Sequence, residues 1–503
     1  MASQRKIGVL LGYANIVIKN LVNLAYTPMI LAFVGKINYG VYQTSNSFVF
    51  SLSLLSFGFS EAYVRFYTQR KANGTEADIR QLNGMYLLLY LCICLVTFVL
   101  GLTFAANADF FFSDSFTTEQ MSLARTLMAI MAVTVTLTLS STVFDAYILA
   151  HEQFKFQQSR QMLVTLAAPG MAFVLLTFGM GTIGVALAQL VMNLLLLILN
   201  ARFAIVKLGM RFDVHQFDST LLKAIAAFSA WIFINQVCEL VNQSLPNTLL
   251  GVLSGPAAVA VFSISVQIRS VFYSLSVTMS SVFTPLINQI VAESDDNTIL
   301  TGLMVRVGRY QSMLYCWVLG GFILLGRFFI DKWAGVEFSG AYSLIIVMVI
   351  PLIIPLTQNT GIEIQRAKNK HRARSVAYLL MAAINVGLTV ALAKPMGYMA
   401  PAVGYVAYVL LGCGIFMNWY YQKRIRLSMG RFWRRVTPVL FNCFAVTACC
   451  MFGSILFPVN SWTTFFAWGV IYSAIYVTTI VKVIMSVDER AMLFGKLHRL
   501  RRT

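Results

Sequence analysis

The sequence predicts an all-α polytopic membrane protein with about fourteen transmembrane helices. Three observations lead to this fold class. Of the 503 residues, 58% are hydrophobic and only 11% are charged, whereas soluble proteins carry about 25% charged residues. Apolar stretches long enough to cross a bilayer recur along the whole chain. The basic residues gather in alternate loops between these stretches, as in membrane proteins with a fixed orientation.

The composition excludes several classes of protein. A chain with 11% charged residues and a mean hydropathy of +0.74 has too few polar side chains to cover a water-facing surface of its size. It therefore fits neither a soluble enzyme, nor a disordered chain, nor a secreted disulfide scaffold. Fourteen spans of about 20 residues would occupy roughly 300 to 350 residues, which leaves short loops and no large soluble domain.

The first apolar stretch, residues 7–35, follows Arg5 and Lys6. It is longer than the hydrophobic region of a signal peptide, about 7–15 residues, and carries no small-residue cleavage site. We therefore interpret it as the first transmembrane helix. Further spans are predicted to begin near Val41, Leu82, Thr118, Ser159, Ile183, Thr220, Ala257, Ile299, Ala341, Ser375, Ala400, Val436 and Trp462.

The predicted spans form two lobes of six helices each and an extension. The predicted boundaries are residues 1–215 for the N-terminal lobe, 216–435 for the C-terminal lobe, 436–484 for two further helices and 485–503 for a basic cytoplasmic tail. A weak internal repeat relates the lobes if a gap of two residues is allowed: Pro28, Gly35 and residues 39–42 correspond to Pro246, Gly255 and residues 259–262. Such repeats are typical of two-lobed transporters with a central site.

The distribution of basic residues predicts the orientation. About 30 of the 38 Lys and Arg residues fall in the loops that an N-terminus in the cytoplasm assigns to the cytoplasmic side. An even number of spans then places the C-terminus in the cytoplasm too. The net charge of +19 is therefore an orientation signal and a means of attracting anionic lipids. It does not indicate nucleic-acid binding, because no basic domain stands clear of the bilayer.

Residue types that carry out catalysis are missing from the predicted membrane interior. The histidines lie in or near predicted loops, at His151, His215, His371 and His498. All eight cysteines fall in predicted spans, where small apolar packing is their usual role. No spacing fits a metal site or a phosphate-binding loop. We therefore expect no enzyme activity, no metal and no cofactor other than a coupling ion.

Three basic residues lie inside predicted spans, where an ionisable group costs about 2.5–3.5 kcal/mol and usually faces a water-filled cavity. Lys19 lies near the middle of the first span, and Asn15 and Asn23 recur beside it at helical spacing. Arg65 lies in the second span and Arg269 in the eighth. The alternative interpretation is structural: the amides join helices, and Lys19 extends its amine to the membrane surface.

Two acidic residues lie in spans as well. Glu239 is near the centre of the seventh span, in a polar stripe with Asn235 and Asn242. It is interpreted as a site for a coupling H⁺ or Na⁺, as a partner of Lys19, or as a protonated group in a helix–helix hydrogen bond. Glu61 precedes Arg65 by four residues, a spacing that favours an ion pair on one helix.

Several segments resemble a known family. They are residues 35–42, residues 57–66, residues 364–374, residues 383–386 and residues 420–423. Together with the number of spans, they are similar to bacterial polysaccharide (O-antigen or capsule) flippases of the multidrug/oligosaccharidyl-lipid/polysaccharide (MOP) exporter superfamily. The resemblance extends over nearly the whole chain.

The resemblance implies a function in the bacterial inner membrane. Such proteins move an undecaprenyl-pyrophosphate-linked oligosaccharide from the cytoplasmic to the outer leaflet by alternating access. In the related lipid II flippases, basic residues of the first, second and eighth spans line the cavity. By this analogy, the substrate-binding candidates are Lys19, Arg65, Arg269, Asn15 and Asn23. The residues expected to respond to H⁺ or Na⁺ are Glu239 and Glu61.

The expected partners follow from the same resemblance. They are the lipid-linked oligosaccharide, membrane lipids and the polysaccharide polymerase machinery, without nucleic acid. The alternative function is a cation-coupled multidrug antiporter of the same superfamily, which predicts an acidic rather than a basic cavity. A membrane enzyme would need a large outer loop or a cytoplasmic catalytic domain, and a scaffold has no use for charges in the membrane.

Overall fold

A computed structural model describes residues 2–214, 218–281, 283–368, 370, 372–487 and 489–490. This part of the chain is helical throughout and contains no strand, so the predicted all-α fold class is confirmed. It contains 11 helical segments long and apolar enough to cross a membrane, or up to 12 if the bent α8 is included. Two of them, Ala14–Asn73 and Ala373–Ile425, have 60 and 53 residues. A crossing needs only about 20 residues, so the predicted fourteen crossings are compatible with these lengths.

The chain packs as two compact units. The first comprises residues 1–263 and 382–404, and the second comprises residues 264–381 and 405–503. This division rests on packing and does not decide the lobe boundaries predicted from the sequence, which stay predictions. Of the predicted tail, residues 491–503 lie outside the described residues.

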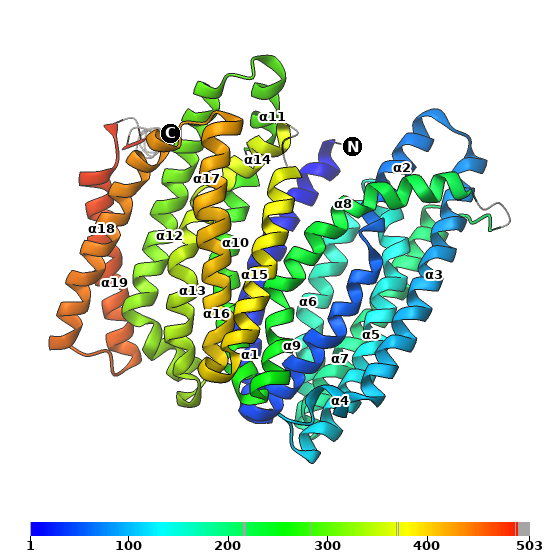
Figure 1. Cartoon of the computed structure of the whole chain (residues 1–503), viewed down its shortest axis with the longest axis horizontal. Helices are drawn as coiled ribbons and strands as arrows, with labels where there is room; N and C mark the ends of the chain where they lie inside the picture. Colours follow the sequence, from blue (N-terminus) through cyan, green and yellow to red (C-terminus); the bar gives the residue numbers. More distant parts are fainter. Residues whose placement is uncertain are drawn as a thin grey trace. The chain divides into compact units, whose positions relative to one another are not determined.

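The first unit begins with the longest helix of the chain. In Figure 1, α1 descends from the N-terminus and the chain then rises again towards α2. The helices of this unit are α1 (Ala2–Phe50), the 3-10 helix η1 (Ser51–Ser56), α2 (Phe59–Asn73), α3 (Glu76–Ala106), α4 (Ala108–Phe112), α5 (Thr118–Ala150), α6 (Phe154–Thr177), α7 (Gly181–Arg202), the π-helix η2 (Phe203–Lys207), α8 (Ser219–Gln243) and α9 (Leu245–Ser254).

Two glycines interrupt the helices at the positions that the internal repeat pairs. Gly35 breaks α1 with φ 72° and ψ 173°, and Gly255 ends α9 with φ 80° and ψ 175°. Backbone of this kind is nearly exclusive to glycine, because a Cβ atom would collide with the neighbouring peptide. The paired segments, residues 39–42 and 259–262, are both buried. The two segments that the repeat pairs therefore share the same backbone conformation at their glycines.

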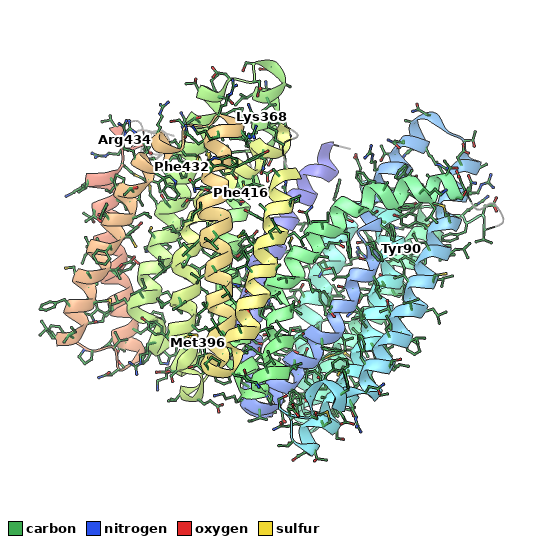
Figure 2. The ribbon with its side chains drawn as sticks, viewed as in Figure 1. Tyr90, Lys368, Met396, Phe416, Phe432 and Arg434 are labelled. Carbon is green, nitrogen blue, oxygen red and sulfur yellow. The ribbon has the colours of Figure 1, made fainter. Side chains whose placement is uncertain are left out.

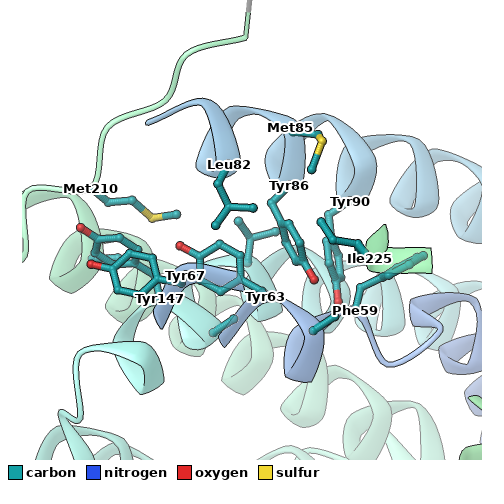
Figure 3. Packing of buried hydrophobic residues seen from close by; sticks show 14 of the residues in the cluster. Phe59, Tyr63, Tyr67, Leu82, Met85, Tyr86, Tyr90, Tyr147, Met210 and Ile225 are labelled. Atoms are coloured by element: carbon teal, nitrogen blue, oxygen red, sulfur yellow. The ribbon is translucent and has the colours of Figure 1, made fainter. Parts of the chain in front are cut away.

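A cluster of tyrosines forms the core of the first unit beside α2. Figure 3 shows Tyr63 of α2 packed between Tyr67 of the same helix and Tyr86 of α3, with Tyr90 next along α3. The ring centroids of Tyr63 and Tyr86 are 4.6 Å apart, and those of Tyr86 and Tyr90 are 5.8 Å apart. The Tyr63 hydroxyl donates to Asn83 Oδ1 at 2.6 Å. These contacts fix the position of α2 against α3.

The second unit is built around one long helix, α12 (Asn297–Trp333). The hydroxyls of Tyr472 and Tyr476 donate to its carbonyls at Cys316 and Met313, at 3.2 and 2.8 Å. The other helices are α10 (Pro256–Ser281, shared with the first unit), α11 (Thr284–Glu293), η3 (Val336–Phe338), α13 (Gly340–Thr357), α14 (Asn359–Ala367), α15 (Arg372–Met396, also shared), η4 (Gly397–Met399, in the first unit), α16 (Ala400–Ala407, also shared), the π-helix η5 (Tyr408–Phe416), α17 (Met417–Tyr420), the π-helix η6 (Tyr421–Ile425), α18 (Met429–Leu456), α19 (Trp462–Thr479) and the π-helix η7 (Ile480–Ile484).

Basic loops predicted to be cytoplasmic lie at one end of the second unit. Figure 2 shows Lys368, which follows α14, at the same end as Arg434 of α18. Lys368 Nζ is 2.6 Å from Asp295 Oδ1 and donates to Asn297 Oδ1 at 2.7 Å. The two loops therefore share one side of this unit, as the predicted orientation requires.

A two-point ion pair joins the end of the described chain to α12. Arg309 Nε donates to Glu489 Oε1 at 2.8 Å, and its Nη2 donates to Oε2 at 2.9 Å. Arg309 also donates to the carbonyls of Arg435 and Ile484, at 2.6 and 2.9 Å. Paired N–H groups of this geometry make the strongest carboxylate contacts in proteins. The segment after α19 is thereby held against the unit.

This ion pair makes stability depend on pH. Burial opposes ionisation of Glu489, but the hydrogen bonds from Arg309 and from the Ser486 N–H outweigh it and lower the pKa of the carboxyl below its ordinary 4.5. A lowered pKa adds stability above the unfolded pKa, and this stability disappears as the pH falls through the folded pKa. We expect acidification from pH 7 to below 4.5 to lower Tm more in the wild type than in Glu489→Gln. Thermal unfolding of both proteins across this range checks it, and parallel curves would contradict it.

Candidate functional site

A cavity of about 390 Å³ lies inside the first unit. It is bounded by the end of α1, η1, the start of α2, and residues of α3, α5 and α8. Its lining is rich in hydroxyl, amide and carboxylate groups: Ser53, Ser56, Ser60, Glu61, Tyr90, Thr138, Thr142, Gln236, Glu239, Gln243 and Ser244, with Phe50, Leu54, Gly58, Leu139 and Leu240. The volume is within the range of small-molecule sites, about 300–1,000 Å³.

The cavity lies where two helical paths are interrupted. The path through η1 stops at Phe57 and Gly58, whose φ values of 48° and 68° are left-handed, and α2 then begins. The path through α8 stops at Gln243. Pro246 in the first turn of α9 has no N–H, so it cannot continue the hydrogen bonds of the helix. Residues at both breaks line the cavity, so the carbonyl ends of η1 and α8 lie beside it.

The structure brings Glu61 and Glu239 to the same cavity. Both residues are exposed and line it. Within the described part of the chain, the lining contains no Lys or Arg. The ion pair that the sequence predicts between Glu61 and Arg65 is not formed between these two described residues, because the Arg65 guanidinium lies over the Phe228 ring, 4.5 Å from its centroid. The cavity is therefore acidic.

Two further oxygen atoms of the cavity residues have no hydrogen-bond partner among the described residues. Tyr90 is 1% exposed, and its buried hydroxyl makes no hydrogen bond. The Oε1 atom of Gln236 is equally buried and unpaired. Sequence reasoning missed Tyr90, because nothing in the pattern distinguishes it from the other 20 tyrosines of the chain. For Gln236 the sequence offers one indication, its position next to the polar stripe that contains Glu239.

The other polar residues predicted on the first span are not among the lining residues of this cavity. Asn15 is buried, and its Nδ2 donates to the carbonyl and to Oε1 of Gln158 on α6, at 2.9 and 2.8 Å. Asn23 accepts a hydrogen bond from Thr27 Oγ1 through its carbonyl, at 3.0 Å. Lys19 is exposed on α1. Asn15 therefore joins two helices, and a substrate role for these three residues stays a prediction.

Arg269 belongs to the second unit, on α10. It is 3% exposed, and its guanidinium lies 4.2 Å from the centroid of the Tyr405 ring. Its Nη1 is also 4.0 Å from Met348 Sδ. A guanidinium stacked on an aromatic face is held in a fixed orientation. Its predicted role in binding substrate is likewise untested.

The fold is similar to two solved transporter structures. Over 98% of this chain and 100% of the other, it matches the lipid II flippase MurJ in an inward closed conformation, with a TM-score of 0.73 and 14% identity. Over 84% and 95%, it matches an inward-facing multidrug resistance MATE family transporter of the MOP superfamily, with a TM-score of 0.65 and 15% identity. At 14% and 15% sequence identity, these similarities show a shared fold.

Sequence comparison agrees with this fold. The chain is 23% identical over 493 residues to the uncharacterized membrane protein EpsK of Bacillus subtilis strain 168, covering 95% of this chain and 94% of EpsK. Residues 6–291 match the family model of the polysaccharide biosynthesis proteins, which is more than half of the chain. The predicted resemblance is therefore confirmed at the level of the family, that of the polysaccharide biosynthesis proteins, and the fold is shared with a lipid II flippase and a transporter of the MOP superfamily. The protein is a multi-span membrane protein that belongs to the polysaccharide biosynthesis protein family.

Proposed function

We propose that this protein is a flippase that moves an undecaprenyl-pyrophosphate-linked oligosaccharide from the cytoplasmic to the outer leaflet of the bacterial inner membrane. The family match over residues 6–291 carries this proposal. The fold shared with a lipid II flippase supports it, because lipid II is itself a lipid-linked saccharide. The protein acts as a transporter and not as an enzyme, by alternating access, and it delivers its substrate to polysaccharide polymerase machinery. Both termini face the cytoplasm, as the basic loops predict.

In this proposal the basic residues bind the substrate and the acidic residues respond to the coupling ion. Lys19, Arg65 and Arg269 bind the pyrophosphate, because ammonium and guanidinium groups form charge-assisted hydrogen bonds with phosphate oxygens. Asn15 and Asn23 contact the sugar, and Asn15 also holds α1 against α6 through Gln158. Glu239 and Glu61 respond to a coupling H⁺ or Na⁺, a role that their shared cavity supports.

One observation favours the alternative function, a cation-coupled multidrug antiporter. The cavity carries two carboxylates, and no basic side chain occurs among its described lining residues. A cationic drug is attracted to such a site, whereas a pyrophosphate is repelled. The MATE-like fold is compatible with this function too. The flippase remains the better supported function because the matching family model is that of polysaccharide biosynthesis proteins.

The first test is the sidedness of the lipid-linked oligosaccharide in cells depleted of this protein. Intact cells are treated with a membrane-impermeant reagent that modifies sugars, and the lipid fraction is then extracted. We expect the intermediate to accumulate unmodified, because it stays on the cytoplasmic side. Cells complemented with the wild-type chain serve as the control.

Two outcomes separate the functions. If the intermediate becomes modified in depleted cells as readily as in control cells, flipping does not depend on this protein. Sensitivity of the same depleted cells to cationic drugs then tests the antiporter. Drug sensitivity with normal sidedness would replace the flippase proposal.

A further inference from the structure

We propose that an arginine-rich surface at one end of the second unit binds the pyrophosphate group of the lipid-linked substrate before transport. This inference rests on the proposed flippase function and deepens it, because it adds a capture site apart from the basic residues inside the spans. The surface comprises the end of η6, the turn that follows it and the first two turns of α18. Its basic residues, all of them exposed, are Lys423, Arg424, Arg426, Arg431, Arg434 and Arg435.

The positive charge of the arginine-rich surface is not compensated by nearby acidic residues. The sequence contains no Asp or Glu between Glu363 and Asp488. Acidic residues of neighbouring segments already have other basic partners, in the pairs Glu363–Arg366, Asp295–Lys368 and Glu489–Arg309. Within the described residues, no ion pair involves any of the six basic side chains. Six exposed groups of one sign therefore attract an anion from outside the protein.

The backbone beneath this surface is held by hydrogen bonds. The N–H of Leu427 donates to the Tyr421 carbonyl at 2.9 Å, and the N–H of Met429 donates to Gln422 Oε1 at 2.8 Å. Arg426 has a left-handed φ of 66°, a conformation that favours glycine. The local fold therefore does not require an arginine at this position, and its guanidinium can serve a ligand. A fixed backbone also reduces the freedom that is lost on binding.

The predominance of arginine favours a phosphate ligand over a general attraction to the membrane. Five of the six basic residues are arginines. Attraction to anionic lipids needs only positive charge, which lysine supplies equally well. A guanidinium presents a planar fork of N–H donors that matches two phosphate oxygens, whereas an ammonium acts as a point charge. A pyrophosphate offers more oxygens and more charge than the single phosphate of an ordinary phospholipid. It is therefore the ligand that this surface fits best.

Two tryptophans indicate that the surface lies at the level of the lipid headgroups. Trp419 of α17 is 49% exposed. Trp433 precedes Arg434 on α18, and its Nε1 donates to Asn418 Oδ1 at 2.7 Å. Tryptophan is enriched where the hydrocarbon of a membrane meets water. Figure 2 shows Arg434 at the same end as Lys368, the end that the predicted orientation assigns to the cytoplasm. A pyrophosphate carried by a lipid in the cytoplasmic leaflet lies at this level.

The test is protection of the arginines from phenylglyoxal, a reagent that modifies guanidinium groups. The purified full-length protein in phosphatidylcholine nanodiscs is treated with and without farnesyl pyrophosphate, and the modified peptides are identified by mass spectrometry. We expect protection of Arg424, Arg426, Arg431 and Arg434. Arg80, an exposed arginine of α3 in the first unit, should stay reactive. Farnesol, which has the same chain without the pyrophosphate, should protect none of them.

Variants measure the contribution of the guanidinium groups. The farnesyl pyrophosphate concentration that half-protects Arg434 reports the affinity of this surface alone. A variant with Arg424→Gln, Arg426→Gln and Arg431→Gln should raise that concentration roughly tenfold or more. Lysine at the same three positions keeps the charge but lacks the planar fork, so it should raise the concentration too, by a smaller factor.

A matched variant controls for the loss of net charge. Lys71→Gln, Arg80→Gln and Lys207→Gln together remove the same charge from exposed positions of the first unit. This variant should leave the half-protection of Arg434 unchanged. All variants are compared as monodisperse protein at equal concentration.

Several results would overturn the capture site. They are the absence of protection, equal protection of Arg80, and half-protection of Arg434 at the wild-type concentration in the glutamine variant. Equal protection by phosphatidylglycerol in the nanodisc would assign the surface to ordinary anionic lipids instead. Protection by farnesyl pyrophosphate with normal oligosaccharide sidedness in depleted cells would keep the site and reject the flippase. Disturbed sidedness without protection would reject the site and keep the flippase.

Discussion

Replacing Lys19 by Gln should abolish oligosaccharide export without reducing the amount of protein in the membrane. Lys19 is exposed on α1, so the change removes a cation and leaves the packing intact. Losing one partner of a desolvated charge pair costs about 2–5 kcal/mol, and the low end of this range already slows transport about thirtyfold. Lys19→Arg should keep most of the activity. Export is measured in depleted cells complemented with each variant.

The control for Lys19→Gln is Lys71→Gln, at a lysine that is also exposed and lies in the last turn of α2. It should export normally. Arg269→Gln should also abolish export, but it should lower stability as well, because the guanidinium is buried against Tyr405. Normal export by both Lys19→Gln and Arg269→Gln, at wild-type protein levels, would show that the assignment of the substrate site is wrong.

Replacing Gly40 by Ala should destabilise the first unit strongly. A Cβ atom at this position of α1 would lie 1.9 Å from the carbonyl oxygen of Pro256 and 3.0 Å from its Cα. The obstacle is backbone, which cannot rotate away as a side chain does. Overpacking of this kind costs about 1–3 kcal/mol or more. Thermal unfolding of the purified variant measures the loss.

The control is Gly170→Ala on α6, where no atom lies within 4 Å of the added Cβ. Since alanine favours a helix over glycine by about 1 kcal/mol, this variant should be at least as stable as the wild type. Equal stability of Gly40→Ala and the wild type would contradict the close approach of α1 to the start of α10.

The fold class could be predicted from the sequence because the bilayer imposes a length and a composition on each span. The continuity of the helices could not. The path from α1 through η1 to α2 reads as two spans with a loop, but the structure keeps it almost wholly helical and breaks it at Gly35 and at Phe57–Gly58. A single glycine inside a helical pattern is tolerated, so the sequence alone does not tell whether the helix breaks there.

The candidate site could be predicted in part. The cost of a charge in the membrane singles out Glu61 and Glu239, and the structure places both at one cavity. Tyr90 and Gln236 are neutral, so no such cost identifies them in a sequence. Their oxygen atoms lack a hydrogen-bond partner among the described residues, which only the packing reveals.

Polar stripes indicate a face of a helix but not its neighbour. Asn15 shares a stripe with Lys19, yet it pairs with Gln158, which is distant in the sequence. Arg269 stacks on Tyr405, which comes from α16. Periodicity contains no information about these partners, because each depends on how separate helices pack.

The matching breaks at Gly35 and Gly255 have a consequence for the history of the chain. At Gly35 no atom lies within 4 Å of an added Cβ, so the backbone geometry alone excludes other residues. A tandem duplication would pass such a requirement to both copies, and it would persist while the surrounding side chains diverged. A deep mutational scan should therefore find two intolerant positions with the same substitution profile, one in each descendant of the ancestral segment.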